Sequence, residues 1–319
     1  MNNFKKVGLT ALAASLATVS TVNAGELAVT GSATMGWSSK EEHDSGGWYM
    51  TDKIVFTGTG TLDNGMDMTL GMSIDESDAA GHTGDKIFEG RYITLSSDAL
   101  GSLTFQGKDG GSVTAAYDDR MPTVYEETWH AATGPTDGPS GSTGAQNMFY
   151  YSNTSIDGVQ LDVSYTPGGG GRGDQGTTEY GIVYSGVEGL TIGLAQGDDQ
   201  SVKNVEVDNT MAYVTYAMGP ITVGYQNNDS SSQTSTASED FEAYALTYAV
   251  SDDLSVMIAE SVIDSADKTV DQEVTTIGAA YSMGSMSIAL QTWDVDNNAG
   301  GTAAADSYGM TDLNISFAF

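Results

Sequence analysis

The chain has 319 residues, of which 43 are acidic and 11 are basic, and its formal net charge is −32. A chain this acidic is repelled by nucleic acid, which excludes a nucleic-acid-binding role. The absence of cysteine excludes disulfide bonds and thiol catalysis.

The N-terminus has the order of a secretory signal peptide. Lys5 and Lys6 form a short positive region, an apolar run follows over residues 7–19, and small residues lead to Ala24. The apolar run is too short for a transmembrane anchor, and Thr and Ser interrupt it. We therefore expect a signal peptide over residues 1–24.

Residues 25–319 show apolar and polar residues in strict alternation, repeated many times. Such a period of two turns one face of a strand to an apolar medium and the other to a polar one. No later segment is a long apolar run, so a membrane would be crossed by strands. We expect about sixteen strands. They cover residues 26–37, 49–62, 66–75, 87–97, 102–108, 146–156, 159–166, 177–185, 190–196, 209–218, 220–226, 240–250, 254–262, 272–282, 285–293 and 307–319.

The connections alternate between short and long. The short ones are rich in Gly, Asn and Asp, as at residues 63–65 and 157–158, whereas the long ones, such as 197–208 and 227–240, are polar. This rhythm predicts an all-β fold, a transmembrane antiparallel β-barrel with short periplasmic turns, long outer loops and an aqueous lumen. A soluble β-sandwich or a β-solenoid adhesin is the alternative. It explains neither the uniform pattern nor the terminal aromatic residue.

The chain ends with outward-parity residues Leu313, Ile315, Phe317 and Phe319. With the segments 25–36 and 90–105 and the long connection that follows, this ending resembles the Gram-negative outer-membrane general porins. The similarity is to the trimeric alphaproteobacterial type of about sixteen strands.

The resemblance implies a homotrimer in the outer membrane, in contact with the lipid bilayer and lipopolysaccharide. It also implies that these last alternate residues are the signal read by the outer-membrane assembly machinery. At residues 106–108 the sequence Gln-Gly-Lys departs from the usual Gly-Arg pair of the family.

The longest connection, residues about 109–146, is the third outer loop. In the family this loop folds into the barrel and narrows the pore. Here it carries acidic residues and one strong base, Arg120, together with Tyr117, Tyr125 and Trp129, which could pack it against the wall. An exposed loop is the alternative, but a connection this long is uncommon without a function. The acidic residues expected at the constriction are Asp118, Asp119, Glu126 and Glu127.

Three scarce cations, Lys53, Arg91 and Lys108, fall on early strands with polar-face parity. A cation on the lipid face costs about 2–4 kcal/mol at midplane, so inward placement is favoured. Facing an acidic loop, they would set up a transverse field that orients dipolar solutes. The alternative is that they are separate surface cations near strand ends.

No catalytic motif is present, and an enzyme is not expected. His43, His82 and His130 fall in expected loops, as solvated residues. Residues 294–300 offer carboxylates for calcium but lack the glycine and the final glutamate of an EF-hand. No cofactor is expected, and loop-bound calcium, between loops or at lipopolysaccharide, is left as an alternative.

The sequence thus predicts a water-filled channel for passive diffusion of small hydrophilic solutes and ions. Acidic loops around its mouth favour cations. The alternatives are a substrate-specific channel with a saturable site and a structural or adhesive surface protein without conductance. An enzyme inside a barrel is more distant, because no set of His, Ser and Asp shares a face.

Overall fold

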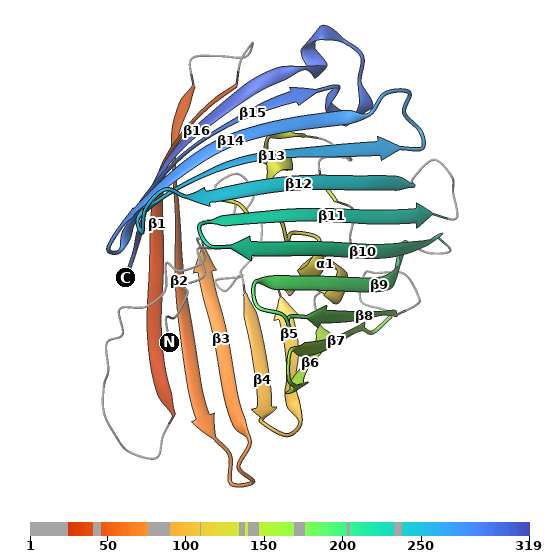
Figure 1. Ribbon diagram of the computed structural model, residues 1–319. Helices are drawn as coiled ribbons and strands as arrows, with labels where there is room; N and C mark the ends of the chain where they lie inside the picture. The colour runs from red at the N-terminus through yellow and green to blue at the C-terminus, as the bar shows by residue number, and fades with distance from the viewer. Residues whose placement is uncertain are drawn as a thin grey trace, which may run out of the picture.

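A computed structural model describes residues 25–40, 46–75, 90–108, 110–133, 138–139, 147–168, 176–202, 205–232 and 238–319, without the side chains of 199–206 (Figure 1). The expected signal peptide, residues 1–24, and the loop residues His43 and His82 lie outside these ranges. In the part of the chain that the structure describes, no helix is both long enough and apolar enough to cross a membrane.

The described residues form sixteen strands in one closed antiparallel barrel, in which each strand pairs with its neighbours in sequence and β1 closes on β16. This confirms the predicted all-β barrel. The strands are β1 Glu26–Lys40, β2 Gly47–Thr61, β3 Asp67–Asp75, β4 Arg91–Ser97, β5 Gly101–Lys108, β6 Met148–Ile156, β7 Val159–Thr166, β8 Thr177–Tyr184, β9 Leu190–Val202, β10 Val205–Met218, β11 Ile221–Ser232, β12 Glu239–Ala249, β13 Leu254–Ser265, β14 Gln272–Met283, β15 Met286–Asp296 and β16 Tyr308–Ala318.

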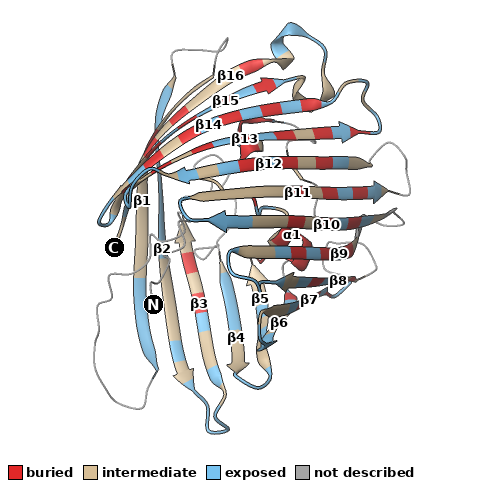
Figure 2. Cartoon of the chain, viewed as in Figure 1, coloured by how far each residue is buried: buried red, intermediate tan, exposed pale blue. Residues whose placement is uncertain are grey.

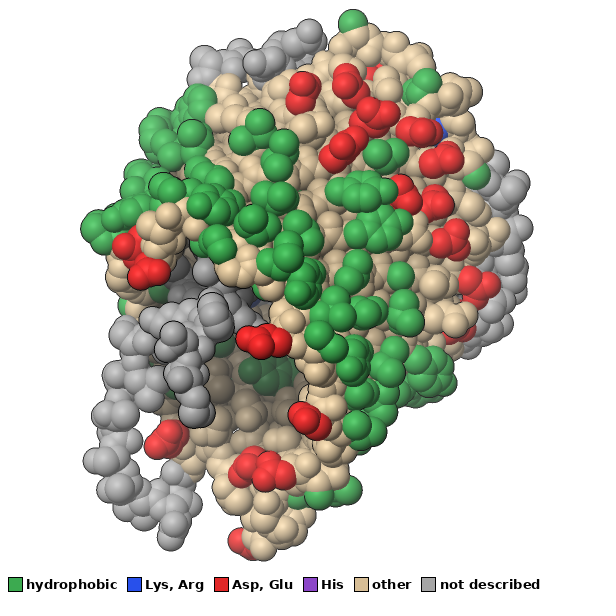
Figure 3. All heavy atoms as spheres, in the orientation of Figure 1, with side chains coloured by type: hydrophobic (Ala, Val, Ile, Leu, Met, Phe, Trp, Pro, Cys, Tyr) green, Lys and Arg blue, Asp and Glu red, His purple; other side chains and the backbone are tan. Residues whose placement is uncertain are grey.

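Apolar side chains cover the outside of the barrel because the alternation turns them there. On β15, Leu290 is 49% exposed while the neighbouring Gln291 is fully buried. Figure 3 shows the hydrophobic side chains as a broad band, with acidic side chains gathered toward the long-loop ends of the strands. A water-exposed surface of this kind would be unfavourable, whereas lipid accommodates it. Members of the band include Ile182, Leu194, Tyr244, Leu246, Tyr248, Ile258, Ile277 and Tyr281.

The short turns lie at one end of the barrel. Gly158 and Gly189 occupy two of them with φ of 71° and 79°, a left-handed backbone that glycine adopts without a steric cost. At the other end β9, β10 and β11 continue well into segments that we predicted to be loops, such as 197–208. That prediction was wrong because backbone pairing continues beyond the lipid, where the outward face needs no apolar residues.

The C-terminal residue completes the closure of the barrel. The backbone N–H of Phe319 donates to Gly31 O at 3.0 Å, and Gly31 N–H donates to Phe319 O at the same distance. Phe317 and Phe319 are about half exposed on the outward face, while Leu313 and Ile315 are partly covered there.

Candidate functional site

Residues 110–133, called the inner loop below, leave β5 and run inside the barrel. They include the helix α1, Val113–Tyr117, and the short 3-10 helix η1, Thr128–Ala131. Helix α1 packs against β7 to β10, and η1 packs against β13 to β15. Figure 1 shows both behind the strands, within the ring. The remaining described residues of the predicted third loop are 138–139.

The wall binds the start of α1 through its free N–H groups. Val113 N donates to Ser164 Oγ at 3.0 Å, and Thr114 N donates to Glu179 Oε2 at 2.7 Å. Ser112 caps the helix by accepting from Ala115 N. Glu179 is fully buried, and its carboxylate is favoured beside N–H groups that water cannot reach. This anchor was not predicted in the sequence analysis.

Aromatic residues of the inner loop pack on the wall, as predicted for Tyr117 and Trp129. The Tyr117 ring meets Tyr213 edge-on at 5.9 Å, and its hydroxyl donates to Asp162 Oδ2 at 2.7 Å. The Trp129 ring meets Phe241 at 4.9 Å. These contacts bury the apolar side of the loop, while Asp119 stays exposed and Asp118, Glu126 and Glu127 are half-buried.

Three wall amides hold the backbone of the inner loop, each through both its oxygen and its nitrogen. Gln226 accepts from Arg120 N at 3.0 Å and donates to Asp118 O. Gln291 accepts from Glu126 N at 3.0 Å and donates to Glu126 O at 2.9 Å. Asn298, in the 3-10 helix η3 (Asn298–Gly300), makes the same pair of bonds with Thr133 at 2.8 Å each. The loop therefore follows the wall from β11 to the connection before β16.

Asp118, Asp119 and Arg120 lie together where the inner loop crosses from α1 toward β11. Burial raises the pKa of Asp118 to about 7, against a lowering by Arg120. The enclosure of the barrel raises the pKa of Asp119 to about 8, although its surface is open to the lumen, and the neighbouring Glu127 and Asp118 add to the rise. The Arg120 guanidinium stands 5.6 Å from the Tyr117 ring centre.

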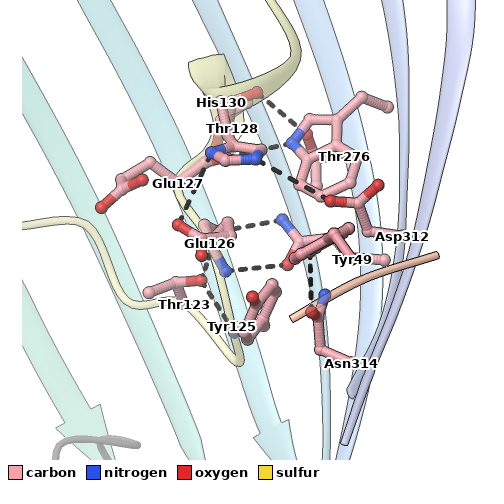
Figure 4. Close-up of polar contacts among 12 residues, drawn as sticks. Tyr49, Thr123, Tyr125, Glu126, Glu127, Thr128, His130, Thr276, Asp312 and Asn314 are labelled. Atoms are coloured by element: carbon pink, nitrogen blue, oxygen red, sulfur yellow. Dashed lines mark hydrogen bonds and ion pairs between the residues drawn. The ribbon is translucent and has the colours of Figure 1, made fainter. Parts of the chain in front are cut away.

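Glu126, Glu127 and His130 form a second polar cluster, on and before η1 (Figure 4). His130 Nδ1 is 3.6 Å from Glu126 Oε2, and His130 Nε2 is 3.8 Å from Asp312 Oδ2 on β16. Burial raises the pKa of Glu126, against a lowering by His130. The prediction of a merely solvated His130 was wrong, because the infolded loop brings it to the wall.

The predicted wall cations do not share one face. Lys53 has inward parity with Tyr49, and its Nζ lies 3.6 Å from Asp75 Oδ2. Arg91 pairs in register with Met72 and shares the outward face of Ile93. Inward placement was therefore the wrong prediction for Arg91, because the apolar residues of β4 fix the register.

Lys108 has the parity of the wall residue Gln106, but the pairing of β4 with β5 shifts between them. Tyr92 pairs with Gln106 and Arg91 pairs with Lys108, so Gly107 has no partner. Lys40, which the sequence analysis did not single out, lies with its Nζ 3.3 Å above the ring of Tyr308.

The carboxylates that were considered for calcium lie elsewhere. Asp294 and Asp296 are exposed on the outward face of β15. Among the described residues, the side-chain group able to share one metal ion is instead Glu126, Glu127 and His130.

The wall partners of the inner loop, Glu179, Gln226, Gln291, Asn298 and Asp312, escaped the sequence analysis. The available signal was a polar residue at inward parity between outward apolar ones, as for Gln291 after Leu290. Inward parity is common to all residues that face the lumen, so it does not predict which of these residues the inner loop covers.

The chain matches a family model described as Gram-negative porin over residues 8–309. Solved structures with the same fold include OmpT, an outer membrane protein of Vibrio cholerae, with 12% identity and a TM-score of 0.71 over 95% of this chain and 100% of that one. A porin refined at 1.8 Å has 19% identity and a TM-score of 0.67, over 92% of this chain and 100% of that one. A triple mutant of Rhodopseudomonas blastica porin has 17% identity and a TM-score of 0.66, with the same coverage. No curated protein matches the chain significantly.

Proposed function

Because the chain belongs to the family of Gram-negative porins, which form channels in the outer membrane, we propose that it passes small hydrophilic solutes by diffusion and prefers cations. The observation that carries this proposal is the inner loop, whose acidic residues are fastened inside the barrel. Carboxylates at the narrow part of a water-filled pore raise the local cation concentration and repel anions.

The proposed constriction lies between the inner loop and the part of the wall that the loop leaves uncovered. The loop side carries Asp118, Asp119, Glu126 and Glu127, as well as Arg120. The uncovered wall carries the cation Lys53 on β2. Lys108 at the end of β5, which was expected from the sequence, remains part of the proposal. Opposite charges on the two sides of a pore order water and orient dipolar solutes. This ordering disfavours the passage of apolar molecules.

The homotrimer belongs to the same proposal, and so does recognition of Phe319 by the outer-membrane assembly machinery. Both are supported by the family and by the apolar outward face at the end of β16, after which Phe319 is 58% exposed. The outer surface would contact lipid and lipopolysaccharide along its apolar band.

Planar-bilayer recordings in a potassium chloride gradient test the proposal. We expect a reversal potential of the sign that favours potassium, and a shift toward zero in the double variant Asp119→Asn with Glu127→Gln. The double variant Asp252→Asn with Asp253→Asn is the matched control, because it removes two exposed carboxylates at the short-turn end. A chloride preference, or a double variant that behaves like the control, would contradict the proposed selectivity.

Liposome swelling in sugars of graded size tests the diffusion of neutral solutes. We expect a swelling rate that falls smoothly with solute size and rises in proportion to solute concentration. Saturation with one sugar would favour a substrate-specific channel instead. Absence of swelling together with absence of conductance would favour an adhesive or structural protein.

A further inference from the structure

The cluster of Glu126, Glu127 and His130 has features that passive diffusion does not require. One ligand atom from each residue lies within 4.8 Å of the others. The ion pairs of this cluster, within the described ranges, are made by His130 alone. Three carboxylates, counting Asp312, therefore surround one imidazole, and this excess negative charge favours a cation.

Asp312 supplies a second and independent observation. Its side chain is 3% exposed, and its Oδ1 atom is buried without a hydrogen-bond partner. Buried carboxylate oxygens are nearly always satisfied, so an orphaned one calls for an explanation. The other oxygen, Oδ2, faces His130 Nε2 at 3.8 Å, which aims the carboxylate into the cluster.

The distance between His130 Nδ1 and Glu126 Oε2 suits two ligands that share an ion better than it suits a hydrogen bond. His130 Nδ1 and Glu126 Oε2 are 3.6 Å apart, whereas N–H···O bonds have lengths of about 2.7–3.2 Å. Two ligand atoms bound to one tetrahedral zinc ion, each at about 2.0–2.2 Å, are about 3.3–3.6 Å apart. A small closing movement would therefore complete the coordination.

The backbone of the cluster is already held in place. Glu126 is fixed by Gln291, Glu127 O accepts from Trp293 Nε1 at 3.0 Å, and Thr128 O accepts from Thr276 at 3.2 Å. The His130 ring lies 5.3 Å from the ring of Trp293. Figure 4 shows the side chains of Glu126 and Asp312 reaching His130 from the loop and from the wall. A rigid frame of this kind lowers the cost of ordering ligands around an ion.

We propose that Glu126, Glu127 and His130 bind a divalent transition-metal ion such as Zn²⁺ inside the barrel, with Asp312 as the positioning residue of His130. His130 Nδ1 and the two glutamates are the ligands, and solvent from the lumen completes the shell. His130 Nε2 faces Asp312 Oδ2 at 3.8 Å, and closure to hydrogen-bond distance would give the arrangement in which a carboxylate orients a metal-bound imidazole. The imidazole nitrogen selects zinc over calcium and magnesium, which prefer oxygen ligands.

The test is titration of the detergent-solubilised protein with zinc chloride, followed by calorimetry and by tryptophan fluorescence, to which Trp293 beside the site contributes. We expect one zinc ion per chain, and calcium chloride or magnesium chloride at the same concentration should give no comparable signal. His130→Gln should lose this binding, and Asp312→Asn should weaken it by about 10–100-fold. Because binding is read without conduction, the result does not depend on the proposed ion selectivity.

The double variant His43→Gln with His82→Gln is the matched control, since it removes the other two histidines of the chain and should leave binding unchanged. Circular dichroism and the thermal unfolding temperature of His130→Gln in the absence of zinc verify that this variant has folded. The inference is overturned if wild-type protein binds no zinc, if His130→Gln still binds it, or if calcium binds equally well. Loss of binding in the double control would assign the metal to the loops instead.

Discussion

The two sides of the barrel wall differ in what covers them. From β9 to β15 many inward residues are buried, and apolar side chains such as Met211, Ala243, Met257 and Ala289 alternate there with buried polar ones. In β1 to β5 the buried residues are few, namely Gly36, Gly71 and Ser73. Figure 2 shows this contrast: red bands, which mark buried residues, cross β9 to β15 and are scarce on β1 to β5.

This difference shows that the inner loop gives one half of the wall a core like that of a soluble protein. The free energy of burial there adds to the backbone pairing of the barrel. The uncovered half must be compatible with water, so it keeps polar side chains such as Lys53 and Asp75. We therefore expect substitutions in the covered half of the wall to change stability and substitutions in the uncovered half to change ion selectivity.

The largest effect is expected from Gly278→Val on β14. A Cβ at Gly278 would lie 2.8 Å from Val124 Cγ2 of the inner loop and 3.1 Å from Met257 Cγ. Overpacking of this kind costs about 1–3 kcal/mol, and we expect a lower thermal unfolding temperature. Displacement of the loop should also speed cleavage by trypsin after Arg120, which mass spectrometry would identify.

Gly58→Val on β2 is the matched control, because a Cβ there meets nothing closer than 4.0 Å. It should unfold like the wild type and resist trypsin equally. Equal destabilisation by the two variants would mean that the covered half contributes no special stability.

The next effect is expected from Gln291→Met, which keeps the shape of the side chain and removes its two bonds to Glu126, but leaves the other anchors of the inner loop in place. Leaving a buried backbone group without a partner costs about 1–3 kcal/mol. Thermal unfolding should show the loss, and trypsin should cut after Arg120 more slowly than in Gly278→Val. Thr275→Val, exposed on the outward face of β14, should have no effect.

The barrel itself could be predicted from the sequence because lipid imposes a strict rule on every crossing strand. Alternate residues such as Ile288 and Leu290 must face outward, and the rule repeats along the chain. The same rule could not describe the inner wall. Inward residues of β13 include Ser255, Met257 and Ala259, and only the path of the inner loop explains this mixture.

Arg91 shows how the rule fails at strand ends. Its charge favoured inward placement, but Ile93 and Leu95 determine the register of β4. A long cation near the edge of the apolar band can reach polar groups with its charged end. The acidic residues of the loop could be identified from the sequence, whereas the contact between His130 and Asp312 depends on the fold of the whole barrel.

A change of pH is expected to alter the ion selectivity of the pore, an effect intermediate between those of the loop variants and that of Lys53→Gln. Asp118 and Asp119, with pKa values of about 7 and about 8, are largely neutral at pH 6 and ionised at pH 9. The preference for potassium over chloride should therefore rise by about twofold between these values. Asp119→Asn should flatten the rise, and Asp253→Asn should not. A preference that falls as the pH rises would contradict the assigned role of these carboxyl groups.

The raised pKa values of Asp118 and Asp119 also determine how the stability of the folded protein depends on pH. Both pKa values lie above the ordinary value of 3.8, so their contribution to folding is fully present below that value. It is lost as the pH rises through 7 to 8. Cleavage after Arg120 should accordingly be faster at pH 9 than at pH 6, relative to the cleavage of an unfolded substrate at each pH.

The smallest effect is expected from Lys53→Gln, on the uncovered wall. Its ion pair with Asp75 is half exposed, and such pairs contribute about 0–1 kcal/mol, so thermal unfolding should hardly change. Loss of an inward cation should nevertheless increase the preference for potassium in bilayer recordings. Arg91→Gln removes the same charge from the outward face and should leave selectivity unchanged. If both variants shift the reversal potential equally, the shift reflects net charge rather than the side of the wall, and the division between a stabilising and a selective half no longer holds.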